Sequence, residues 1–131
     1  DGSPWRVGIE RPAETQDAPG QLLRPIELAD LALATSGDYR NYFEADGTRY
    51  SHTIDPRTGQ PIEFGLASVS VLHENCMTAD ALATALMVLG VDEGYNFAVE
   101  HDLAVLLVIR DDEGGFQQRT TPAFEKLTEQ Q

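Results

Sequence analysis

Apolar residues recur along the chain at the spacing of β-strands. Short runs rich in Val, Ile, Leu and aromatic residues predict strands at Trp5–Ile9, in the C-terminal half of Ile26–Thr35 and at Leu66–His73. Leu103–Arg110 is almost continuously apolar, which is typical of a strand buried on both faces. A turn after this run should lead into a partner strand at Phe116–Thr121. The pattern therefore predicts an antiparallel sheet.

Turn and loop signals separate these strands. Asp46-Gly47 is the strongest short hairpin signal in the chain, and it lies between the predicted strands Asn41–Ala45 and Thr48–Ile54. The polar segment Ala13–Gly20 contains Pro and Gly and predicts a loop. The tail beyond Lys126 is polar, so we expect it to be frayed.

Two stretches have the composition of helices. Thr78–Leu89 is rich in Ala and Leu, with Thr78 as the expected N-cap and Gly90 as the C-cap. Asp92 is expected to cap a second helix that ends near His101. No repeat or linker divides the chain. Residues 1–131 should therefore form part of a single α+β domain, an antiparallel sheet with two helices packed on it.

The charge and the cysteine content narrow the function classes. The formal net charge is −13 over 131 residues, and such a surface repels phosphate backbones, which argues against nucleic-acid binding. No apolar run reaches the roughly 18 residues of a membrane-spanning helix. Cys76 is the single cysteine, so the chain has no internal disulfide, and its apolar neighbours predict a small buried side chain.

The predicted helix at Thr78–Leu89 carries a carboxylate and a hydroxyl on one face. Asp80 and Thr84 are four positions apart, so their side chains lie on neighbouring turns. Two such oxygens suit Mg²⁺, which often binds a few protein oxygens together with substrate phosphates. The alternative is that Asp80 is a charge at the helix N-terminus and that Thr84 bonds back to its own backbone. The spacing alone leaves both interpretations open.

A second candidate is the turn Thr35-Ser36-Gly37-Asp38, which we expect to end a strand. Gly37 would allow positive φ and a close approach of the backbone to a ligand, with the Ser36 hydroxyl beside it. A plain turn of the same composition is the alternative. The aromatic residues that follow, Tyr39, Tyr42 and Phe43, are interpreted as packing residues.

His52 is the candidate for proton transfer. It follows a predicted strand, and Pro56 holds Asp55 extended, so the histidine should be exposed at the end of a hairpin. Histidine is the side chain best suited to accept a hydroxyl proton near neutral pH. The alternative is a surface histidine held by Asp55. Asp55 and Arg57 are expected to form a local ion pair that stabilises this loop.

Four sequence blocks together resemble one known family. They are Trp5-Arg6-Val7-Gly8-Ile9-Glu10-Arg11-Pro12, Thr35-Ser36-Gly37-Asp38-Tyr39, His52-Thr53-Ile54-Asp55-Pro56-Arg57-Thr58-Gly59 and Ala79-Asp80-Ala81-Leu82-Ala83-Thr84-Ala85-Leu86. In this order they resemble the ApbE family of FAD:protein FMN transferases, and the match runs along nearly the whole chain. Family members are roughly twice this length, so the chain resembles their C-terminal part, with the N-terminal half absent. Asp1-Gly2 is a typical hairpin-turn dipeptide, which suggests a chain that starts within a hairpin.

The resemblance implies a T-fold-like domain and assigns roles to the candidate residues. Thr35, Ser36 and Gly37 would lie beside bound FAD. His52 would lie near the flavin diphosphate as cofactor contact and catalytic base. Asp80 and Thr84 would bind Mg²⁺, which would bridge the acidic protein and the anionic diphosphate.

The resemblance also implies partners and alternatives. FMN would pass from FAD to a Thr or Ser hydroxyl of an acceptor flavoprotein, with release of AMP, and the parent protein would be located in the bacterial cell envelope or periplasm, with a lipid anchor. One alternative is a module that binds FAD, or hydrolyses it to FMN and AMP, without transfer. Another is a fragment that is inactive without its N-terminal half or a partner chain.

Overall fold

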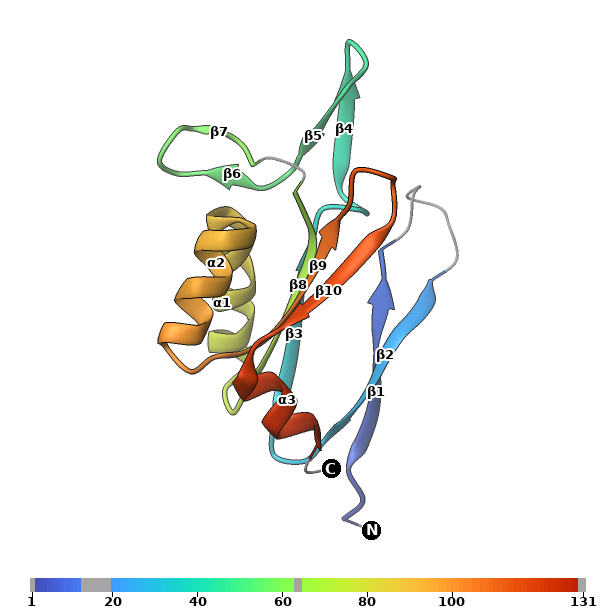
Figure 1. Cartoon of the computed structure of the whole chain (residues 1–131), viewed down its shortest axis with the longest axis vertical. Coiled ribbons are helices and arrows are strands. Elements are labelled where there is room, and N and C mark those ends of the chain that lie inside the picture. The colour runs from blue at the N-terminus through green and yellow to red at the C-terminus, as the bar shows by residue number, and fades with distance from the viewer. Residues whose placement is uncertain (1, 13–19, 63–64, 130–131) are drawn as a thin grey trace.

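A four-stranded antiparallel sheet forms the centre of the computed structural model, which describes residues 2–12, 20–62 and 65–129 (Figure 1). Its strand order is β10-β9-β8-β3. The bounds are β3 Ala32–Gly37, β8 Leu66–His73, β9 Ala104–Arg110 and β10 Phe116–Thr120. Seven of the eight residues of β8 are buried, because both faces of the sheet are covered. The strands predicted from Leu66, Leu103 and Phe116 onward are confirmed.

Two helices cover one face of this sheet, α1 Cys76–Leu89 and α2 Val91–Glu100 (Figure 1). The first core cluster lies between them and the sheet. Its buried residues are Ile62, Leu66, Val69, Val71, Ala79, Ala83, Leu86, Met87, Ala98, Val105 and Leu107. The small side chains of Ala79 and Ala83 allow α1 to pack closely on β8.

A hairpin and a third helix cover the opposite face. The hairpin pairs β1 Trp5–Arg11 with β2 Gln21–Leu28, and the helix is α3 Pro122–Glu129 (Figure 1). The second core cluster consists of Ile9, Ile26, Ala67, Leu72, Ala104, Leu106, Val108 and Phe124. The architecture is therefore three-layered and belongs to the predicted mixed class, with antiparallel sheets.

Two small hairpins extend beyond the end of the sheet (Figure 1). One pairs β4 Tyr42–Ala45 with β5 Thr48–Ser51, and the other pairs β6 Ile54–Asp55 with β7 Gln60–Pro61. Asp46 has a φ of 52° and Gly47 a φ of 76°, as a tight hairpin turn requires. The hairpin predicted around this dipeptide is confirmed, although its second strand ends at Ser51.

The predicted count of two helices was wrong, because α3 occupies the segment expected to end in a frayed tail. The Thr121 hydroxyl accepts a hydrogen bond from the Phe124 backbone N–H at 3.4 Å, and Pro122 starts the helix. Phe124 is fully buried against the sheet. The Thr-Pro pair was a usable start signal, but the polar composition of the segment obscured it.

Two of the three predicted helix caps were also wrong. Asn75, two residues before Met77, is the N-cap of α1, and its side-chain oxygen accepts the Thr78 N–H at 3.1 Å. Gly90 is the C-cap of α1, as predicted, and also the N-cap of α2, so Asp92 lies in the first turn of α2 instead of capping it. Cys76 is exposed because the buried face of α1 begins at Ala79.

The segment Ile26–Thr35 contains the end of one strand and most of another. Asp30, with a φ of 56°, lies between β2 and β3. β3 includes Ser36 and ends at Gly37, so the strand ends within Thr35–Asp38 as expected. The loop predicted at Ala13–Gly20 lies outside the described residues, apart from Gly20. Among the helices that the structure describes, none is long and apolar enough to cross a membrane.

Candidate functional site

The two predicted metal ligands lie on the exposed side of α1. Helix α1 begins at Cys76 and has no acidic residue in its first turn, so Asp80 is not a terminal dipole charge. Asp80 and Thr84 are both exposed, next to the buried Ala79 and Ala83. Within the described part of the chain, no hydrogen bond or ion pair engages the Asp80 carboxylate. An exposed carboxylate of this kind is available to an incoming cation.

Ser36 joins the predicted flavin-binding strand to the predicted metal helix. Its Oγ lies 2.9 Å from Thr84 Oγ1. The Thr84 hydroxyl also lies 3.4 Å from the Asp80 carbonyl oxygen, the longer and weaker contact. Two sites that were predicted independently, 48 residues apart, are therefore in direct contact.

Thr35 lies on the opposite face of the sheet from Ser36, because successive side chains of a strand alternate. Its Oγ1 lies 2.8 Å from Ser70 Oγ. A flavin contact for Thr35 stays a prediction. Gly37 is not one of the described glycines with a positive φ, in contrast to the expectation. It leaves room for an aromatic ring, since a Cβ there would come within 2.7 Å of Tyr39 Cε1.

Asp38 is a site residue that the sequence reasoning missed. Its side chain is fully buried. Arg110, at the end of β9, donates to both of its carboxylate oxygens at 2.8 and 2.7 Å and to the Leu66 carbonyl at 3.2 Å. The partners are 72 positions apart, so no local pattern could reveal the pair. A bidentate, buried ion pair ties the end of β3 to the centre of the sheet.

His52 is exposed, as predicted. Its Nδ1 lies 2.6 Å from the Asn41 carbonyl oxygen, which also accepts the His52 backbone N–H at 3.3 Å. A carbonyl only accepts, so Nδ1 carries the proton and the neutral ring has its lone pair on Nε2. Asn41, and not Asp55, therefore holds the ring with Nε2 available as a base.

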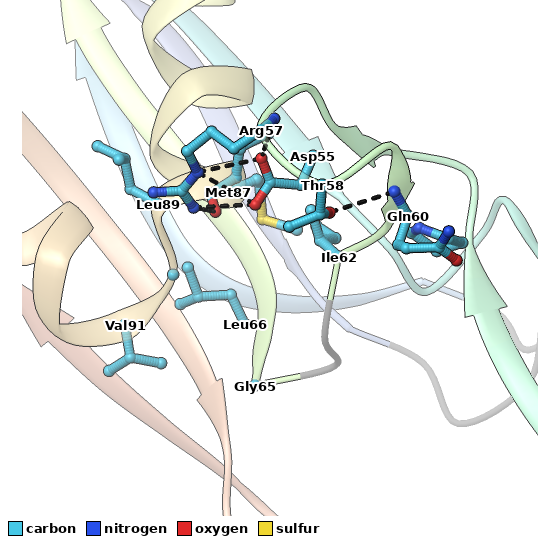
Figure 2. A pocket seen from close by; sticks show the side chains of 13 residues that line it. Asp55, Arg57, Thr58, Gln60, Ile62, Gly65, Leu66, Met87, Leu89 and Val91 are labelled. Atoms are coloured by element: carbon cyan, nitrogen blue, oxygen red, sulfur yellow. Dashed lines mark hydrogen bonds and ion pairs between the residues drawn. The ribbon is translucent and has the colours of Figure 1, made fainter.

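The loop after His52 is held against the helices by Arg57, which faces Asp55 in Figure 2. Arg57 donates to Asp55 Oδ2 at 2.9 Å, which confirms the predicted ion pair. It also reaches Glu93 Oε2 and the Val88 carbonyl, each at 3.4 Å. A cavity of about 530 Å³ lies beside this contact, lined by Asp55, Arg57, Thr58, Gln60, Pro61, Ile62, Gly65, Leu66, Met87, Val88, Leu89, Gly90 and Val91.

Because of the Asp55–Arg57 ion pair, we expect the stability of the fold to depend on pH. Hydrogen bonds from the Arg57 side chain and backbone hold the pKa of Asp55 below its ordinary value of 3.8. A carboxyl with a depressed folded-state pKa stabilises the fold above its unfolded-state pKa and loses that contribution as the pH falls through the folded value. We expect Arg57→Gln to lower the melting temperature at neutral pH, and this deficit to shrink below about pH 4. Thermal melts of the wild type and of Arg57→Gln, from neutral pH to below pH 4, measure this difference in melting temperature. A deficit independent of pH would contradict the assignment.

The oxygen donors of α1 fit a hard cation only in part. Asp80 and Thr84 offer a carboxylate and a hydroxyl, the donor types that Mg²⁺ prefers. Among residues 2–12, 20–62 and 65–129, no group of three or more His, Cys, Asp or Glu residues is placed to hold a metal. Asp80 and Thr84 are therefore two donors of the expected types, and within the described residues they do not belong to a larger cluster of such residues.

Comparison with known proteins identifies the family of the chain. The model of the ApbE family matches residues 1–107. This chain belongs to the ApbE family. The relatives named FAD:protein FMN transferase include one from Vibrio cholerae, 48% identical over 124 residues, and one from Haemophilus influenzae, 46% identical over 129 residues. These alignments cover 95% and 98% of this ApbE-family chain.

Solved structures show the same fold. The apo form of the Pseudomonas stutzeri flavinyl transferase ApbE matches with a TM-score of 0.79 and 46% identity over 97% of this chain. The ApbE protein of Thermotoga maritima matches with a TM-score of 0.78 and 35% identity. The chain spans only 38% of each of these structures and 36% of the two curated relatives.

Proposed function

We propose that the protein carrying this chain transfers FMN from FAD to a Thr or Ser hydroxyl of an acceptor flavoprotein, with Mg²⁺, and releases AMP. The observation that supports it most is the cluster of Asp80, Thr84 and Ser36 on α1 and β3 of an ApbE-family chain. Asp80 and Thr84 are the proposed metal ligands. The proposal places the remaining ligands and the contacts to the isoalloxazine ring in an upstream segment or a partner chain.

The bound cation would supply charge neutralisation, which this acidic chain needs in order to hold an anionic diphosphate. Asp80 would hold it from the exposed side of α1, and Thr84 would contribute a neutral oxygen one turn further along. With a net charge of −13, the chain alone would repel FAD. Metal dependence and acidic charge therefore support the same proposal.

His52 is the proposed general base. Nε2 takes the proton of the acceptor hydroxyl, whose oxygen forms a new bond to the FMN phosphorus. The bond between that phosphorus and the bridging oxygen breaks, and AMP leaves with the bridging oxygen. Water in place of the acceptor would give FMN and AMP.

A mass measurement tests the proposed function. The full-length protein is incubated with FAD, Mg²⁺ and an acceptor domain, and the acceptor should gain the mass of one FMN phosphoester while AMP appears. AMP without acceptor gain would favour FAD hydrolysis, and flavin binding without AMP a binding module. Residues 1–131 tested alone should show no binding if an N-terminal half is required. On the family resemblance alone, we also propose the bacterial cell envelope or periplasm as its location, with a lipid anchor.

Substitution of the histidine gives a sharper prediction. His52→Ala should lower the rate of FMN transfer by about 10²- to 10⁴-fold, the usual contribution of a general base. FAD binding should change little. The measurement is AMP release under saturating FAD and Mg²⁺.

His101→Ala is the matched control for this variant. His101 is also exposed, and its Nδ1 also lies near a backbone carbonyl oxygen, that of Phe97, at 2.9 Å. The control should keep wild-type activity. Equal rates for the two alanine variants would show that His52 is not the general base.

A further inference from the structure

We propose that Ser36 is a positioning residue for the metal ligand Thr84, and that the buried Asp38–Arg110 ion pair fixes the strand end that carries Ser36. The inference rests on the proposed function, because it assumes that Thr84 faces a cation. It assigns Ser36 a role different from flavin contact, and it assigns a role to two residues that contact neither flavin nor metal. Three observations support it.

The first observation is the pair of hydrogen-bond partners that surround the Thr84 hydroxyl. A hydroxyl that gives its lone pair to a cation has to point its proton elsewhere. The structure offers two acceptors, Ser36 Oγ at 2.9 Å and the Asp80 carbonyl at 3.4 Å. Either hydroxyl can donate in the Ser36–Thr84 contact, but with a cation on Thr84 the closer Ser36 Oγ would accept the Thr84 proton and leave a Thr84 lone pair for the metal. Outer partners of this kind orient metal ligands in proteins.

The second observation is the weak support that β3 receives from the sheet. It is the last strand in the order β10-β9-β8-β3, so within the described residues it pairs only with β8. Ser36 is the penultimate residue of this strand. The ends of edge strands fray easily. An unanchored end would let the Ser36 hydroxyl move away from Thr84.

The third observation is the anchor that follows directly. The Asp38 backbone N–H donates to the Ala67 carbonyl at 3.1 Å, which extends the pairing with β8 by one bond. The Asp38 carboxylate accepts hydrogen bonds from both terminal nitrogens of Arg110, on β9, at 2.8 and 2.7 Å. Since Asp38 is fully buried, the pair is shielded from solvent screening. Two strands therefore fix the backbone two residues beyond Ser36.

The test measures metal affinity separately from turnover in the full-length protein with FAD present. Binding of Mn²⁺ is followed by loss of its free-ion EPR signal, and Mg²⁺ dependence by AMP release. We expect Ser36→Ala and Asp38→Asn each to weaken Mn²⁺ binding by about 10- to 100-fold, the usual effect of losing an outer partner of a metal ligand. The Mg²⁺ requirement should rise in parallel, and kcat at saturating Mg²⁺ should stay near wild type. Ser36→Thr, which keeps the hydroxyl, should restore affinity.

Two controls separate positioning from general destabilisation. Thr128→Ala removes a hydroxyl of α3 that donates to the Phe124 carbonyl, and Arg24→Gln breaks an ion pair with Glu125; both lie remote from α1. Neither should change Mn²⁺ affinity. The double variant Ser36→Ala/Asp38→Asn should bind Mn²⁺ about as weakly as the worse single variant, since both act through one hydroxyl.

The outcomes distinguish this inference from the proposed function. A wild-type protein without Mg²⁺-dependent AMP release would overturn the proposed function, while the Mn²⁺ comparison would still test the role of Ser36. Ser36→Ala binding Mn²⁺ as tightly as Thr128→Ala would overturn the inference and leave the function intact. A fall in kcat with unchanged metal affinity would also overturn it.

Discussion

Asp80→Asn should abolish metal-dependent FMN transfer in the full-length protein. The substitution removes the negative charge that attracts the cation while it preserves size and helix geometry. We expect a loss of at least about 10²- to 10³-fold, the range for removal of one electrostatic stabiliser of a transition state. AMP release at increasing Mg²⁺ concentration measures it. The folded state should be unaffected, because no partner within the described residues depends on this carboxylate.

Glu100→Gln is the control for this prediction. It removes an exposed charge from the neighbouring helix α2 and should leave transfer unchanged. Wild-type activity of Asp80→Asn at low Mg²⁺ would rule out Asp80 as a metal ligand.

Arg110→Met should cause the largest loss of stability. It leaves the fully buried Asp38 carboxylate without the guanidinium that now contacts both of its oxygens. Removal of one partner from a buried ion pair costs about 3–5 kcal/mol, because an uncompensated charge remains in the interior. Denaturant unfolding measures the change in the free energy of unfolding.

A second ion pair provides the comparison. Arg24 and Glu125 also form a bidentate pair, but their side chains are 30% and 37% exposed. Arg24→Met should therefore cost about 1 kcal/mol or less. The variant Asp38→Leu/Arg110→Met should recover much of the loss, since apolar replacement of a buried pair is often neutral. Similar costs for the two single variants would mean that Asp38 reaches solvent.

Local patterns predicted the parts of the fold that depend on local physics. The continuous apolar run at β9 and the alternation at β8 identified the central strands, and Asp46-Gly47 identified a hairpin. The third helix was missed because Phe124, which packs on the sheet, is its one fully buried residue. A single buried aromatic in a polar segment gives too little periodicity to detect.

In the site, too, local spacing was predictable and contacts between distant segments were not. Spacing along one helix placed Asp80 and Thr84 on neighbouring turns. The contact of Thr84 with Ser36 and that of Asp38 with Arg110 depend on how β3, β9 and α1 are arranged in space. Long-range pairs of this kind follow from sheet order, which no single segment of the sequence contains. Sequence reasoning could therefore name the proposed ligands but not the residues proposed to orient them.

The position of the His52 ring has a consequence for repeated turnover. Its Nδ1–H points at the Asn41 carbonyl. This N–H is present in both the neutral ring and the imidazolium, so gain or loss of a proton at Nε2 leaves the anchoring bond in place. If His52 is the general base, as proposed, it would pass through a full catalytic cycle without rotating or releasing the hairpin. The base would then need no realignment between one acceptor molecule and the next.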